Sequence, residues 1–425
     1  MQPKRLALQF SLAALMLIIT FSAVGMGVWR HFQEYKAFHR NLMNQAEHIR
    51  PEPGPATFKN FLFGKAYDVD HLSFRDNRSF GDDEMAALLP LTKLRRLSLQ
   101  NTSISDDVAE TLTQFPELRV LSVAGTNVGD PFADQISELS QLEELYVSTT
   151  TISDEGAASI AKLGTLRVLT LSETSVSNVG LREVAKLQNL ESLSLQLRRM
   201  PTHWLAELEP LKNLRSLKLD AVDDLGVQEL AKLERLEELQ VLGAGYNGNI
   251  ECLGTLSNLK QLQMRVSTDA RGGRLPTMPK LEFLELKSEV GFSIIDQPSL
   301  KRLEYRMRRL PRDIEISNSP VLDYLQIEQE SSSGTNVEMV VQLSDLPQLV
   351  WLKVVCCSLK ISGRLDNLEK LDVYDQGPKG SFSPPGTFTL KVEEKLPALG
   401  LVGVPKGYQR DESTEKIIRY RRHRK

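Results

Sequence analysis

Large aromatic and charged side chains gather in the C-terminal third of the sequence, at positions that the surrounding apolar pattern leaves facing outward. Aromatic rings next to arginine dominate the energy of many protein–protein contacts, because they bury a large rigid area at low entropic cost. The chemistry they suggest is non-covalent recognition of another macromolecule. The residues that we predict for this role are Phe283, Tyr324, Trp351 and Tyr374, interleaved with Arg265, Lys287, Arg302, Arg306 and Lys353 and set against Glu285, Glu304, Glu328 and Asp372.

Residue patterns typical of catalytic, metal and cofactor sites do not occur in the sequence. The six histidines are scattered, and the three cysteines lack the spacing of a disulfide framework or a zinc site. The glycine-rich stretch Gly243–Gly248 lacks the lysine and the helix start of a phosphate-binding loop. We therefore predict no catalytic residue, no metal and no cofactor, and a binding protein rather than an enzyme. Two alternatives stay open: a structural envelope spacer with no specific ligand, and an unrecognised enzyme in the irregular C-terminal half.

An LxxLxL frame places the predicted binding residues. It recurs every 24 residues from Leu94 to Leu214 as LRRLSL, LRVLSV, LEELYV, LRVLTL, LESLSL and LRSLKL, and it continues with looser spacing to Leu396. Side chains alternate across a strand, so the second and third leucines point inward while the residues between them point outward. Stacked copies then form a parallel sheet, and the third, fifth and seventh positions of each copy form its open concave face.

This recurring frame resembles the leucine-rich-repeat family, over about residues 60–403. The resemblance implies an α/β fold, a right-handed solenoid with a parallel sheet on the concave side. The repeats are also similar to those in bacterial leucine-rich-repeat proteins and in the substrate-recognition part of F-box ubiquitin ligase receptors. No segment resembling an F-box precedes them. Together with the aromatic and charged residues described above, the fold predicts a protein partner.

Threonine recurs eight residues after the first leucine of a copy, where many members of the family carry asparagine. We predict that these inward hydroxyls hydrogen-bond the neighbouring turn and continue a ladder. Cys357 falls at the same position after Leu349, and we interpret its thiol as structural. The threonines are Thr102, Thr126, Thr150 and Thr174.

Four residues beyond each threonine the sequence has a carboxylate or amide, followed by a short run with helical apolar spacing. A side chain of this type accepts hydrogen bonds from the first turn of a helix, so the pattern predicts helix N-caps and convex helices from Leu94 to about Leu236. Beyond about Gly243 the segments become rich in proline, serine and β-branched residues, which predicts strands or extended loops instead. The predicted caps are Asp106, Asp130, Asp154 and Asn178.

The segment 6–29 carries no charged residue. Roughly 20 apolar residues cross the hydrocarbon core of a bilayer as a helix, so we predict a single transmembrane anchor after a short flank, residues 1–5. The alternative is a signal peptide cleaved near Ala23 and Gly25. Basic residues flank both sides, so charge says little about orientation. We expect the solenoid on the extracytoplasmic side, because that arrangement is usual for a signal anchor.

Residues 30–50 keep apolar side chains at helical spacing, and the prolines of 51–59 end any helix there. This predicts a juxtamembrane helix followed by a linker. The helix would either pair two chains into a homodimer or lie on the lipid surface or against the first repeat.

Residues 404–425 end in a basic run, which we interpret as a solvated tail. Short basic clusters can attract anionic lipid or nucleic acid. The formal net charge of the whole chain is −3, so we predict no specific nucleic-acid binding.

Overall fold

A computed structural model of the chain describes residues 70–89, 91–196, 202–220, 222–246, 250–266, 273–288, 292–307, 314–329, 341–355, 358–361, 365, 367–373, 388–392, 408–411 and 417–422. The predicted flank 1–5, anchor 6–29, juxtamembrane helix 30–50 and linker 51–59 lie outside these residues, and so does Cys357. Within the described part, no helix has the length and apolar character needed to span a membrane.

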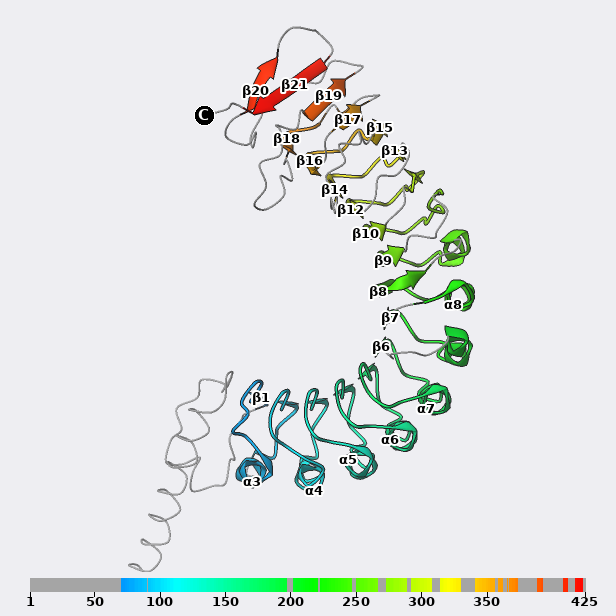
Figure 1. Cartoon of the computed structure of the whole chain (residues 1–425). Helices are drawn as coiled ribbons and strands as arrows, with labels where there is room; N and C mark the ends of the chain where they lie inside the picture. The colour runs from blue at the N-terminus through cyan, green and yellow to red at the C-terminus, as the bar shows by residue number, and fades with distance from the viewer. Residues whose placement is uncertain are drawn as a thin grey trace, which may run out of the picture.

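One long parallel sheet lines the inner side of an arc-shaped solenoid (Figure 1). Its fourteen strands follow one another in chain order, each paired to the next. The strands are β1 (His71–Ser73), β2 (Arg96–Ser98), β3 (Val120–Ser122), β4 (Glu144–Tyr146), β5 (Val168–Thr170), β6 (Ser192–Leu195), β7 (Ser216–Leu219), β8 (Glu238–Tyr246), β9 (Gln261–Val266), β10 (Phe283–Ser288), β12 (Arg302–Met307), β14 (Tyr324–Gln329), β16 (Trp351–Val355) and β18 (Lys370–Val373).

The leucines of the LxxLxL frame form the core behind this sheet, as predicted. Leu97 pairs with Leu121 in register, and Leu121 pairs with Leu145. All three are essentially inaccessible to solvent. Burying such a side chain contributes about 1.5–3 kcal/mol. In a solenoid each repeat contacts only its neighbours, so this stabilisation comes from packing against the adjacent repeats.

Short helices cover the outer side of the first part of the arc (Figure 1). Their location confirms the prediction of convex helices from Leu94 to about Leu236. The helices are α3 (Asp82–Met85), η1 (Ala86–Leu88), α4 (Val108–Leu112), α5 (Asp130–Ile136), α6 (Asp154–Ile160), α7 (Asn178–Val184), η2 (Thr202–Leu208), α8 (Asp224–Leu230) and η3 (Ile250–Thr255), where η denotes a 3-10 helix.

The predicted N-caps were wrong by one or more residues. Asp130, Asp154 and Asn178 are the first residues inside their helices, and the side chain of Ser153 caps α6 by accepting from the Glu155 N–H. Asp106 precedes the N-cap residue of α4, and that helix start has no side-chain cap.

The aspartates bind the next repeat instead of their own helix. Asp154 accepts hydrogen bonds from the N–H of Ser177 at 2.7 Å, the Ser177 hydroxyl at 2.6 Å and the N–H of Gly180 at 2.9 Å. Asp130 makes the same three contacts to the following repeat. A Cβ at Gly180 would lie 2.6 Å from the Asp154 carboxylate, so glycine at this site permits the close approach. These carboxylates join consecutive repeats at their helix starts.

The threonines also differ from the prediction. Thr102, Thr126 and Thr150 are buried, but each hydroxyl donates to a backbone carbonyl three residues earlier in its own turn, at 2.6–2.7 Å. The hydroxyl therefore closes the turn after each strand, and the ladder between repeats is made by the backbone.

A second sheet replaces the helices on the outer side beyond η3, which confirms the predicted change near Gly243 (Figure 1). Its seven strands run in the order β11-β13-β15-β17-β19-β21-β20. Their bounds are β11 (Ile294–Ile295), β13 (Ile314–Ser317), β15 (Val341–Ser344), β17 (Ser358–Ile361), β19 (Phe388–Val392), β20 (Tyr408–Asp411) and β21 (Ile417–Arg422).

Buried polar side chains hold this part together. The fully buried amide of Gln297 donates to the carbonyls of Pro276 and Ile295 and accepts from the Met278 N–H. Tyr305 occupies a core position of the frame, and its hydroxyl accepts the Phe292 N–H at 2.7 Å.

The segment predicted as a solvated basic tail, 404–425, contains two strands. β21 pairs antiparallel with β19, and β20 pairs antiparallel with β21. The residue pattern from Ile417 to Arg422 has the alternation of a strand, and the basic residues concealed it. Because the hairpin follows the last parallel strand of the outer sheet, it covers an edge that would otherwise be open.

Candidate functional site

The register of the sheet aligns the predicted binding residues into rows that cross neighbouring strands. Phe283 on β10 pairs with Arg302 on β12, Arg302 with Tyr324 on β14, and Tyr324 with Trp351 on β16. We call this third-position series the aromatic row. Neighbouring strands lie about 4.8 Å apart, so side chains at equivalent positions are within contact distance.

The aromatic row is a continuous stack. The Arg302 guanidinium carbon lies 4.4 Å from the centre of the Tyr324 ring and 6.0 Å from that of Phe283. On the other side Tyr324 meets Trp351 edge to face, with ring centres 5.0 Å apart and an angle of 84° between the planes. A guanidinium over a ring face and an edge-to-face pair of rings are both favourable arrangements for the aromatic quadrupole. The row therefore holds three partly exposed rings in fixed orientations.

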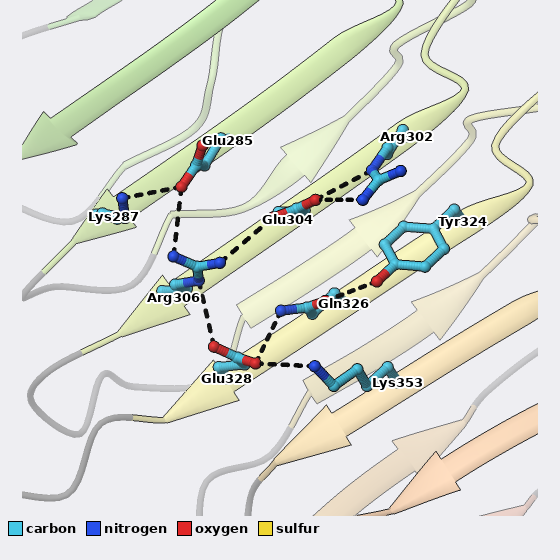
Figure 2. Close-up of polar contacts among 9 residues, drawn as sticks. All are labelled: Glu285, Lys287, Arg302, Glu304, Arg306, Tyr324, Gln326, Glu328 and Lys353. Carbon is cyan, nitrogen blue, oxygen red and sulfur yellow. Dashed lines mark hydrogen bonds and ion pairs between the residues drawn. The ribbon is translucent and has the colours of Figure 1, made fainter. Parts of the chain in front are cut away.

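Beside the aromatic row lies a network of ion pairs on the fifth and seventh positions of the same strands (Figure 2). Arg306 lies near its centre, 3.5 Å from carboxylate oxygens of Glu285 and Glu304 and 3.2 Å from one of Glu328. Its buried Nε is not aligned to donate to Glu328 despite that short distance, so the charges rather than a hydrogen bond hold this pair.

The network is connected to the aromatic row by two residues. Arg302 binds Glu304 through two nitrogens, at 2.7 and 3.0 Å. The Tyr324 hydroxyl donates to Gln326 at 2.6 Å, and the Gln326 amide donates to Glu328 at 2.8 Å (Figure 2). Burial, as the largest cause, raises the pKa of Tyr324, so this hydroxyl stays protonated and able to donate. These links hold the rings and the charged groups in one arrangement.

Of the nine predicted site residues, the structure describes the side chains of eight and brings them onto one face. Lys287 pairs with Glu285 at 2.9 Å and Lys353 with Glu328 at 3.2 Å. Arg265 lies beside Lys287, at the same register position on β9. Tyr374, the remaining one, lies outside the described residues, and so do the side-chain positions of β18.

The N-terminal part of the concave face differs in composition. Its outward positions carry mostly small side chains such as Ser122, Thr170 and Ser194, as the sequence indicates. Arg96, Glu144 and Tyr146 are exceptions, and the Tyr146 hydroxyl bonds to Glu144 at 2.7 Å. Burial and the adjacent carboxylate raise the pKa of Tyr146 to about 12.

Within the described part of the chain, no group of three His, Cys, Asp or Glu side chains is arranged to hold a metal ion. The charged residues of the concave face pair with one another across an open sheet surface (Figure 2). Groups arranged in this way suit non-covalent recognition.

A family model described as a leucine-rich repeat region matches residues 107–384. The chain belongs to the leucine-rich-repeat family. Such families are generally protein-interaction modules without enzymatic activity. No curated protein matches the sequence.

Solved structures of other leucine-rich-repeat proteins are similar to this chain. A leucine-rich-repeat protein of Leptospira interrogans is 17% identical, with a TM-score of 0.45, over 78% of this chain and 95% of that one. An internalin C2 of Listeria monocytogenes is 25% identical, with a TM-score of 0.36, over 45% of this chain and 78% of that one. A second Listeria monocytogenes internalin, inlF, is 18% identical, with a TM-score of 0.36, over 75% of this chain and 93% of that one.

Sequence reasoning missed two features of this leucine-rich-repeat protein. Gln326, whose side chain is nearly inaccessible, links Tyr324 to Glu328, and an isolated amide carries no signal that would reveal such a role. The second-position residues form a ladder of alternating charge along the sheet, with ion pairs such as Arg119–Glu143 at 2.5 Å and Arg167–Glu191 at 2.9 Å. This ladder could have been found from the sequence, because its residues directly follow the first leucine of successive copies. The series is Arg119, Glu143, Arg167, Glu191, Arg215, Glu237, Lys260, Glu282, Lys301 and Asp323.

Proposed function

We propose that this chain is a membrane-anchored recognition module that binds a protein partner through the C-terminal part of its concave face. The observation that carries the proposal is the aromatic row, in which Arg302 is stacked between Phe283 and Tyr324 and Trp351 packs against Tyr324. Rigid aromatic groups with arginine lose little entropy on binding and bury much area, which makes them favourable contact residues.

The support behind the row also favours binding. Leu303 and Leu325 lie in the core directly behind the row and are fully inaccessible. Glu304 and Gln326 fix the Arg302 and Tyr324 side chains from the side. A partner would therefore meet a surface that is already ordered, and little conformational freedom would be lost on binding.

The aromatic row is tested by replacing Phe283, Tyr324 and Trp351 with alanine in the full-length chain. A matched control replaces three concave residues of the N-terminal strands, Val120→Ala, Tyr146→Ala and Val168→Ala. Each protein is purified in detergent, checked for equal secondary structure by circular dichroism and mixed with solubilised membrane and envelope material. Proteins captured by crosslinking are then identified by mass spectrometry.

We expect the wild type and the control to capture the same protein and the aromatic variant to lose it. A partner retained by all three proteins would place binding elsewhere. If none of the three captures a protein, the structural spacer becomes the better explanation of the solenoid.

The membrane anchor is the second part of the proposal, and its support is the uncharged segment 6–29. The full-length chain should remain in the membrane fraction after alkaline carbonate extraction. Protease added outside intact cells or spheroplasts should digest the solenoid, as expected for an extracytoplasmic location. Release of the chain by carbonate, together with a mass showing a new N-terminus near residue 26, would favour the cleaved signal peptide.

The juxtamembrane segment 30–50 adds a proposal on oligomeric state: two chains pair through it. A single cysteine introduced at Leu42, in a chain whose three native cysteines are changed to serine, should form a disulfide-linked dimer on oxidation in the membrane. If single cysteines introduced in turn at Phe38, Leu42 and Ile49 all fail to crosslink, the monomer is favoured.

A further inference from the structure

The charged residues beside the aromatic row are unequal in sign. On the described concave positions of β9 to β16, five cations stand against three carboxylates, an excess of two positive charges. The whole chain has the opposite balance, with a formal net charge of −3. The cations are Arg265, Lys287, Arg302, Arg306 and Lys353, and the carboxylates are Glu285, Glu304 and Glu328.

The two signs also differ in exposure. The side chains of Glu285, Glu304 and Glu328 are only 12–21% exposed, whereas those of Lys287, Arg302, Arg306 and Lys353 are 25–51% exposed. The acids lie low in the network and the cations lie over them. A molecule that approaches this face therefore meets mainly positive charge.

Each acid is already satisfied by two cations. Glu285 contacts Lys287 and Arg306, Glu304 contacts Arg302 and Arg306, and Glu328 contacts Arg306 and Lys353. Arg306, in contrast, is shared among three acids at 3.2–3.5 Å, longer than ordinary charged hydrogen bonds. The network can accept a further oxygen ligand more readily than a further cation.

Arg265 strengthens this asymmetry. It lies at the seventh position of β9, next to Lys287 on β10, and Lys287 lies next to Arg306 on β12. Among the described residues Arg265 has no ion-pair partner. Like charges on neighbouring strands repel, and a partner carboxylate over them would relieve that repulsion.

We propose that this face binds an acidic, aromatic-containing segment of a protein partner. Partner carboxylates would lie over Arg265, Lys287 and Arg306, and an apolar or aromatic partner side chain would pack on Tyr324 and Trp351. This inference rests on the proposed function and adds the chemistry of the partner to it.

The strand geometry sets the spacing within that segment. Tyr324 and Lys287 are two strands and four residues apart, which is about 10 Å across the sheet and about 13 Å along it. The direct separation is about 16 Å, or roughly five residues of extended chain at about 3.3 Å each. The carboxylate and the aromatic side chain of the partner should therefore be separated by about five residues.

The test uses a display library of random 12-residue peptides, selected against the full-length chain in detergent. Binding of the selected peptides, made synthetically with a fluorescent label, is measured by fluorescence anisotropy. We expect Asp and Glu to be enriched over the unselected library, about five residues from Trp, Phe or Tyr. Replacing these acids by Lys in the peptide should abolish binding.

Two variants of the chain separate charge from fold. Arg265→Gln with Lys287→Gln should weaken binding of the selected peptides about tenfold, and raising the salt concentration should weaken wild-type binding. Lys212→Gln with Lys280→Gln removes the same charge outside the concave face and should leave the affinity unchanged. Circular dichroism of both variants serves as the check that each has folded.

The outcomes distinguish this inference from the proposed function. Peptides that lose binding in the aromatic variant but show no enrichment of acids, or bind equally to Arg265→Gln with Lys287→Gln, overturn the acidic partner and leave the binding face in place. Selection of basic peptides also overturns it. If no peptide is selected, or if the aromatic variant selects the same peptides, both proposals fail.

Discussion

The two halves of the solenoid share one sheet and one leucine core, yet they differ on the concave face and on the outer side. From β2 to β6 the concave positions are mostly small, and the outer helices are joined by carboxylates such as Asp154. From β9 to β16 the concave positions are mostly large and many are charged, and the buried amide of Gln297 connects the segment after β11 to the segment before β10. The frame therefore specifies the core alone. The surfaces on either side can diverge, and a binding face can develop in one half without disturbing the stacking.

The largest effect should come from removing the buried amide of Gln297, which connects neighbouring repeats in the C-terminal half. Gln297→Leu leaves the Met278 N–H and the Pro276 and Ile295 carbonyls without their side-chain partner in a fully buried site. Unpaired buried polar groups cost about 1–3 kcal/mol each, so we expect a loss of about 3 kcal/mol. Urea unfolding followed by circular dichroism measures it.

Gln263→Leu is the matched control, because it makes the same change on the open concave face. It should alter stability by less than about 0.5 kcal/mol. If both variants lose the same stability, the buried amide is not the joint between these repeats.

The next largest loss of stability should come from removing the carboxylate of Asp154, which connects neighbouring repeats in the N-terminal half. Asp154→Ala removes three hydrogen bonds to the following repeat, with an expected cost of about 2 kcal/mol. Glu155→Ala, on the same helix but exposed, should change stability by less than about 0.5 kcal/mol. Hydrogen exchange at the first turn of α7 reports the loss locally, and unchanged protection there would show that the repeats do not depend on this carboxylate.

The same carboxylate makes the N-terminal half sensitive to acid. Burial acts on the pKa of Asp154 in the upward direction, but the hydrogen bonds from the Ser177 hydroxyl, the Ser177 N–H and the Gly180 N–H outweigh it, so its pKa lies below the ordinary value. A folded-state pKa below the unfolded value of about 3.9 stabilises the fold above that pH, and the contribution is lost as pH falls through the folded pKa. Asp154→Asn should remove that part of the pH dependence.

The sequence predicted the core and the concave face because both follow from a single alternation, as Leu97, Ser98 and Leu99 illustrate. It did not predict the contacts between repeats. Asp154 has the spacing of a cap, but the donors it meets are about 24 residues later, and periodicity alone does not tell which turn supplies them. Tyr305 occupies a leucine position, and only its buried neighbour Phe292 explains the hydroxyl. The acids and cations of the concave face were found, but their difference in exposure depends on side-chain packing.

A smaller effect concerns the turn after each of the strands β1 to β5, where one residue is left-handed. After β1 and β2 this residue is Asp76 and Asn101, residue types that tolerate positive φ. After β4 it is Thr149, with a φ of 58°, and β-branched residues are strained there. Thr149→Asn places the residue type of Asn101 at this position and should raise stability by about 1 kcal/mol.

Glu173→Asn tests the same position, with a φ of 55°, in a residue that is not β-branched. Its gain should be smaller than that of Thr149→Asn. Equal gains, measured by thermal unfolding, would show that the branch at Cβ contributes nothing and that asparagine simply suits the turn.

The smallest effect should come from the ladder of alternating charge, which the two halves have in common. Glu191 lies between Arg167 and Arg215 in this ladder, and the hydrogen bond from Arg167 is the main cause that holds the pKa of Glu191 below its ordinary value. Glu191→Lys places three cations in succession and should lower the thermal midpoint at low salt. In about 1 M NaCl the screening length is only about 3 Å, and the difference should disappear. Glu138→Lys makes the same change of charge at an exposed site outside the ladder and should show little dependence on salt. A midpoint of Glu191→Lys that stays low in high salt would mean that packing of the side-chain stems, rather than charge, stabilises the ladder.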